Sequence, residues 1–237
     1  MLSLLFGLLG VPVGLALDQG VERLAVPPGD DEDASLEADA SPPALHAEAG
    51  TLVVAASPTQ EWLRRALIVA ATAGLFAAAG LRYDDPLDLT IVAAYCCVLL
   101  VCAATDALSF RVPNVVTYPA ILGALLIGGV MPDANILGVL AGGALAGGVL
   151  LVPSLITGGV GMGMGDVKLA TFVGLALGFE LAVPAMLLMA FAGGIAAVLL
   201  LLTGIRKRGE PIPYAPFISG GALAVLLWQG TAFVVLT

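Results

Sequence analysis

Long apolar runs, each about as long as a membrane-spanning helix, constrain the fold of this chain more than any other feature. A helix that crosses a bilayer needs about 20 mostly apolar residues, and the sequence has such runs at residues 62–81, 89–105, 115–131, 136–157, 169–205 and 217–236. The runs are apolar all round and lack the alternating segments of about 10 residues that mark a membrane barrel. Only 11% of the residues are charged, against about 25% in soluble domains. We therefore expect an all-α, polytopic integral membrane protein.

A helix at residues 1–17 and the division of the run 169–205 into two helices bring the expected number of membrane helices to about eight. Residues 1–17 lack the basic start and the small-residue cleavage site of a signal peptide, so we interpret them as the first membrane helix. The run 169–205 is too long for one crossing. We expect a short helix of about 12 residues, a turn near Glu180–Pro184 and then a second helix.

The positions of Lys and Arg set the expected orientation, because these residues favour the cytoplasmic side of a membrane. With the N-terminus outside and eight crossings, Arg82 is the one base of the 9 that falls outside. A single crossing at 169–205 would move the basic cluster at 206–208 to the outer side. We therefore expect a multi-pass protein of the inner (cytoplasmic) membrane, surrounded by lipid.

Acidic residues are concentrated in one part of the chain. Residues 18–61 hold ten of the 18 Asp and Glu side chains and a single base, Arg23. We interpret this segment as an acidic, flexible cytoplasmic loop, which leaves residues 62–237 as the membrane-embedded core. The net charge of −9 argues against nucleic acid as a partner, because binding it requires a basic surface.

The cysteines give no sign of a metal site. Cys96, Cys97 and Cys102 lie in one apolar run and form no Cys-x-x-Cys pair. We expect them to be small buried side chains of a helix and expect no bound metal.

Two carboxylates are the candidate reactive groups. The topology places Asp106 at the cytoplasmic end of the third helix and Asp166 at the cytoplasmic start of the sixth. Either one alone is explained by a helix end that faces water, but two at one level indicate function. Neighbouring carboxyl groups share a proton, so the ionised one can activate water while the other donates to a peptide carbonyl, as in aspartic proteases.

The stretch "GMGMGDVKL", residues 161–169, surrounds the second of these acids. Gly161, Gly163 and Gly165 remove side chains where another backbone could approach closely, and we interpret them as contacts for the backbone of an extended substrate. A turn or helix packing is the alternative. Lys168 either favours the ionised form of Asp166 or anchors the helix at the membrane surface.

Together with "DALSFRVPN", this stretch resembles a known family. The first contains Gly-x-Gly-Asp, and the second contains Asp106 followed after six residues by Pro113 and Asn114. In this order they resemble the prepilin leader peptidases, which are membrane aspartic proteases. Segments 14–24 and 212–223 resemble the family's opening and closing motifs. The resemblance implies that Asp106 and Asp166 are catalytic and that a type IV prepilin or pseudopilin is the substrate, cut at its basic leader on the cytoplasmic face.

One departure from the family concerns its second activity. Many members carry two Cys-x-x-Cys pairs after the first helix and methylate the new N-terminus with S-adenosylmethionine. Here that region has no cysteine. We expect no cofactor for proteolysis, and S-adenosylmethionine only if methyl transfer is retained.

Three alternatives stay open at this point. The chain could be a related preflagellin or presenilin-like peptidase, a transporter or channel whose two acids bind a cation or relay protons, or a non-catalytic subunit of a pilus or secretion machine. The identity of the pilin, the oligomeric state and any recruitment of the leader by the acidic loop are also open.

Overall fold

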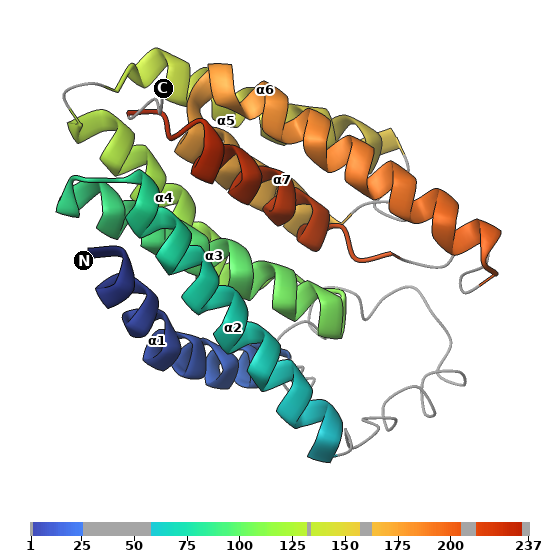
Figure 1. Ribbon diagram of the computed structural model, residues 1–237. Coiled ribbons are helices and arrows are strands. Elements are labelled where there is room, and N and C mark those ends of the chain that lie inside the picture. Colours follow the sequence, from blue (N-terminus) through green and yellow to red (C-terminus); the bar gives the residue numbers. More distant parts are fainter. Residues whose placement is uncertain (1, 26–57, 132–133, 157–162, 205–211, 234–237) are drawn as a thin grey trace, which may run out of the picture.

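The computed structural model describes residues 2–25, 58–131, 134–156, 163–204 and 212–233, and these ranges form seven helices (Figure 1). In chain order the helices are α1 (Leu2–Ala25), α2 (Pro58–Arg82), α3 (Pro86–Ser109), α4 (Asn114–Val130), α5 (Ile136–Ile156), α6 (Met164–Leu202) and α7 (Ala215–Trp228). Five of them, α1, α2, α3, α5 and α6, are long and apolar enough to cross a membrane, whereas α4 and α7 are shorter apolar helices. The all-α expectation is confirmed.

Helix α6 is divided by a sharp break at Gly178. This residue has φ 73° and ψ 173°, a backbone conformation that is readily accessible only to glycine. The break separates a short helical part, 164–177, from a longer one, 179–202. A short helix followed by a turn near Glu180–Pro184 was expected in this run. The turn lies at Gly178 instead, and Pro184 is part of the second helical part.

Helices α1 and α2 form a closely packed pair at one side of the molecule (Figure 1). A Cβ on Gly10 would lie 2.6 Å from the Cα of Ala73, and one on Gly14 would lie 2.8 Å from the Cα of Val69. Such backbone approaches are typical of membrane helices, where small residues create the contact surface.

The α1–α2 pair also contains a buried ion-pair cluster. Asp18 is fully buried, and its carboxylate accepts hydrogen bonds from Arg64 at 3.2 Å and from Arg65 at 2.8 Å. Glu22 also pairs with Arg64. Because these acids are neutralised by bases of α2, α1 continues past residue 17 to Ala25. Residues 18–25 of the predicted acidic loop are therefore helical, and its central part, 26–57, lies outside the described residues.

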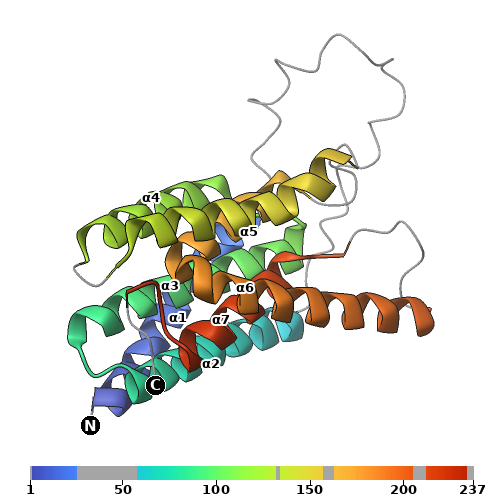
Figure 2. The ribbon, with the colours of Figure 1, turned by 90° about the horizontal axis from the view of Figure 1, so that it is seen from above.

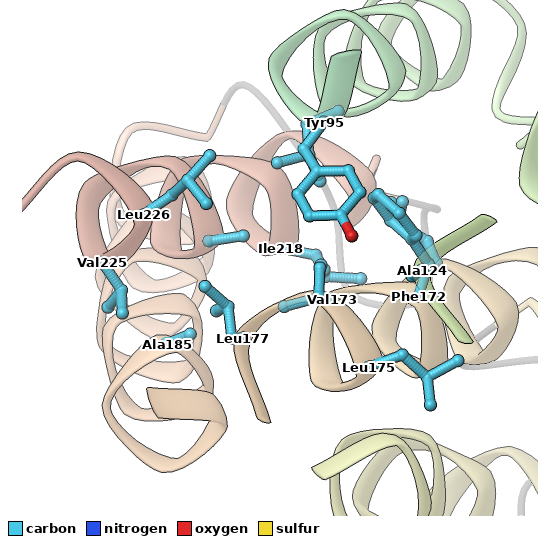
Figure 3. Packing of buried hydrophobic residues seen from close by; sticks show 14 of the residues in the cluster. Tyr95, Ala124, Phe172, Val173, Leu175, Leu177, Ala185, Ile218, Val225 and Leu226 are labelled. Carbon is cyan, nitrogen blue, oxygen red and sulfur yellow. The ribbon is translucent and has the colours of Figure 1, made fainter. Parts of the chain in front are cut away.

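The packed core lies between the α1–α2 pair and the α4–α5 side (Figure 2). It is built from α3, the first part of α6, and α7. Tyr95 of α3 meets Phe172 of α6 edge to face, with ring centroids 5.4 Å apart, and Leu226 of α7 lies on the other side of Tyr95 (Figure 3). Many large apolar side chains elsewhere are exposed, Leu8, Leu122, Leu155 and Phe191 among them, as expected for surfaces that face lipid.

Candidate active site

Asp106 lies in the last turns of α3 and is almost fully buried. Phe110 ends the helix in the left-handed conformation, with φ 55°, and its N–H donates to the carbonyl oxygen of Asp106 at 2.8 Å. The carboxylate is held from another element, because the N–H of Ala215 donates to Oδ2 of Asp106 at 3.0 Å. The start of α7 therefore fixes the side chain of an acid on α3.

Asp166 is the third residue of α6 and is also buried, with 8% of the residue exposed. Its N–H donates to the carbonyl oxygen of Gly163 at 3.1 Å, which closes the first turn. Within the described ranges, Oδ1 of Asp166 is buried and has no hydrogen-bond partner. Buried carboxylate oxygens are nearly always bonded, so this atom is available to a ligand.

The two sequence motifs are in direct contact. A Cβ on Gly165 would lie 2.9 Å from the Cβ of Val112, so the glycine lets the start of α6 pack on the α3–α4 connection. Lys168 donates to Oδ1 of Asn114 at 2.8 Å and lies over the ring of Tyr118, 4.7 Å from its centroid. The lysine thereby ties α6 to α4. Within this arrangement Asp106 and Asp166 interact electrostatically.

The described residues that were singled out from the sequence therefore lie in one region of the structure. Pro113 precedes α4, and its carbonyl oxygen accepts from Thr117 N–H at 3.1 Å. Gly161 lies outside the described residues. Lys168 contacts Asn114 and Tyr118, a bridge that sequence reasoning did not predict.

Ala215 is the contact of Asp106 that the sequence did not reveal. It contributes a backbone N–H, and no side-chain pattern marks such a donor. The only signal was the resemblance of segment 212–223 to a family motif, which indicated the segment but not its contact with Asp106.

The cysteines form no disulfide or metal site among the described residues. Cys96 and Cys102 are buried in α3, Cys97 is half-buried, and all three are free thiols. In the part of the chain that the structure describes, no three His, Cys, Asp or Glu residues are grouped so that they could hold a metal ion. The absence of a metal stays a prediction.

Comparison with known proteins points to one family. A family model described as the type IV leader peptidase family matches residues 93–198, a range that includes both acids. A prepilin leader peptidase/N-methyltransferase of Bacillus subtilis is 34% identical over 161 residues, which cover 66% of this chain and 63% of that protein. The chain is similar to the type IV leader peptidase family over the part that carries both acids.

Other relatives of this peptidase family carry the same name. The protein of Burkholderia pseudomallei is 29% identical over 71% of this chain and 56% of its own length. That of Aeromonas salmonicida is 32% identical over 55% of this chain and 46% of its own length. The chain thus spans about half to two thirds of the length of these peptidases. No solved structure matches it.

Proposed function

We propose that this protein is a membrane aspartic endopeptidase that removes the basic leader of a type IV prepilin or pseudopilin, with Asp106 and Asp166 as its catalytic residues. The observation that carries the proposal is the contact between the two motif segments, Gly165 on Val112 and Lys168 on Asn114. This contact brings two buried, electrostatically interacting acids together from different helices. The names of the relatives support the substrate class.

The chemistry follows from two carboxyl groups in one water-poor place. Because neighbouring carboxyl groups do not readily ionise together, the pair holds one proton. The ionised member takes a proton from water, whose oxygen attacks the carbonyl carbon of the scissile peptide, while the protonated member donates to the carbonyl oxygen. Collapse of the diol then breaks the C–N bond, and no acyl-enzyme forms.

A direct experiment is cleavage of a prepilin by the purified full chain in lipid. Mass spectrometry of the product identifies the cut bond and, in parallel reactions with and without S-adenosylmethionine, shows whether the new N-terminus is methylated. We propose that proteolysis needs no cofactor and that S-adenosylmethionine serves only methyl transfer, if that is retained. A substrate that stays intact under conditions in which the protein is folded would contradict the proposed function.

We further propose eight crossings of the inner membrane, with the N-terminus outside and both acids near the cytoplasmic face. The break at Gly178 supports this count, because it turns α6 into two helical parts. Contacts between helix ends agree with it: Asp18 near the end of α1 pairs with Arg64 near the start of α2, and Ala215 of α7 bonds Asp106 of α3.

Thiol labelling of intact cells tests this orientation. In a variant without Cys96, Cys97 and Cys102, a membrane-impermeant maleimide should label Asp84→Cys but not Thr203→Cys; both native residues are exposed in the structure. After the cells are permeabilised, both variants should be labelled. Labelling of Thr203→Cys in intact cells would show that α6 crosses the membrane once.

Removal of the Lys168 bridge should slow cleavage without unfolding the protein. Lys168→Met and Asn114→Ala each remove the same hydrogen bond, and we expect each to lower kcat/KM about tenfold, since a charge-assisted hydrogen bond contributes about 1.5–3 kcal/mol. The double variant should lose little more than either single one, because the two residues share one interaction. Lys168→Arg is the control that keeps the cation. Additive losses would show that the residues act separately.

A further inference from the structure

The amide of Ala215 holds the carboxylate of Asp106 from another helix. It is the first residue of α7, it is fully buried, and its N–H donates to Oδ2 of Asp106. Tyr214, which precedes α7, makes no side-chain capping bond. The carboxylate of Asp106, from α3, therefore takes the place that an N-cap side chain of the same helix usually fills.

A buried N–H donor stabilises the charged form of the carboxyl group that it contacts. The positive end of the α7 dipole acts in the same direction. Asp166 lies in the first turn of α6 and also experiences a helix dipole, so the dipoles alone do not separate the two acids. Each acid also has one backbone donor, Ala215 for Asp106 and Gly163 for Asp166. The difference between the two acids therefore lies in the remaining oxygen of Asp166.

Asp166 is the less favourable site for a negative charge because of one of its two oxygens. Its Oδ1 is buried and unpartnered among the described residues, and an ionised oxygen without a donor is unfavourable away from water. A protonated carboxyl group at this position has an O–H that can donate to an incoming carbonyl. Cys102, one turn earlier than Asp106 on α3, is another titratable group that interacts electrostatically with Asp106.

We propose that the Ala215 amide is a positioning group that keeps Asp106 as the ionised member of the pair, so that Asp106 is the general base and Asp166 carries the shared proton. This assignment rests on the proposed peptidase function. Water gives a proton to Asp106, its oxygen bonds to the carbonyl carbon, and Asp166 protonates the carbonyl oxygen. Asp106 then protonates the leaving nitrogen as the C–N bond breaks, and a diol hydroxyl returns its proton to Asp166. Both acids end in their starting states.

The sharpest test removes the N–H donor of residue 215 and keeps its side chain. Lactic acid in place of Ala215, introduced by nonsense suppression, replaces the N–H by an ester oxygen and keeps the methyl group. We expect kcat for a prepilin to fall about ten- to a hundredfold, with KM unchanged because the amide does not touch substrate. The same ester substitution at Ala224, an exposed residue of α7, is the matched control with near-normal kcat. Unchanged kcat in the ester variant, or a loss expressed in KM alone, would overturn the proposal.

A second comparison decides the matter even if the ester variant is unstable. Asn at position 166 still offers an N–H to the carbonyl oxygen, whereas Asn at position 106 cannot take a proton. In single-turnover reactions Asp166→Asn should therefore cleave at least about tenfold faster than Asp106→Asn. Equal residual rates, or the reverse order, would refute the assignment. If the wild-type chain cleaves and these orders fail, the assignment is wrong and the peptidase function stands. If the wild type does not cleave, the function itself fails.

Discussion

Replacement of either Asp106 or Asp166 by Asn should reduce prepilin cleavage by about a thousandfold or more, because each variant removes one half of the acid–base pair. Asn is close to Asp in size. The hydrogen bond that Oδ2 of Asp106 accepts from Ala215 can be kept by the amide oxygen, so the fold should survive. Activity is measured as the rate of leader release, and folding as the thermal unfolding of the purified variant.

Asp84→Asn is the matched control for these variants. Asp84 is exposed in the connection between α2 and α3, at the opposite end of α3 from Asp106. It should cleave at the wild-type rate. If Asp106→Asn and Asp166→Asn both cleave at rates near wild type, the aspartic mechanism is wrong. The two acids would then be candidates for a cation or proton site.

Substitution of Gly174 by Ala should destabilise the protein by about 4 kcal/mol or prevent its accumulation in the membrane, because the added methyl group meets backbone. A Cβ on Gly174 would lie 2.5 Å from the carbonyl carbon of Gly142 on α5 and 2.9 Å from the Cβ of Ala146. Neither helix can yield locally, since the contact is between main chains. The crossing also positions the first part of α6, which carries Asp166.

Gly148→Ala provides the comparison on α5, the helix that Gly174 of α6 meets. A Cβ at Gly148 meets nothing within 4 Å, and alanine is favoured over glycine in a helix interior by about 0.5–1 kcal/mol. This variant should be as stable as the wild type or slightly more stable. Resistance to unfolding is measured by titration with a denaturing detergent in mixed micelles. Equal stability of Gly174→Ala and Gly148→Ala would show that α5 and α6 do not cross this closely.

The sequence alone was informative about the fold because membrane helices leave a strong local signal. An apolar run of sufficient length has few alternatives to a helix, since its backbone groups must bond internally. The same reasoning separated the run 169–205 into two helical parts. It placed the turn too late, because Pro184 was treated as the break while Gly178 is the residue that adopts a positive φ. The helical state of residues 18–25 was missed because the bases that neutralise Asp18 lie on another helix.

For the candidate site, the sequence indicated the candidate side chains, and the tertiary structure decided how they are held. Asp106, Asp166, Gly165, Lys168 and Asn114 stand in short motifs, and motifs are visible in a single chain. Contacts between distant segments are not: that Gly165 accommodates Val112, that Lys168 bonds Asn114, and that the amide of Ala215 supports Asp106 depend on the packing of α3, α4, α6 and α7. A backbone donor carries no side-chain signature, so only the assembled helices could show that the start of α7 holds an acid of α3.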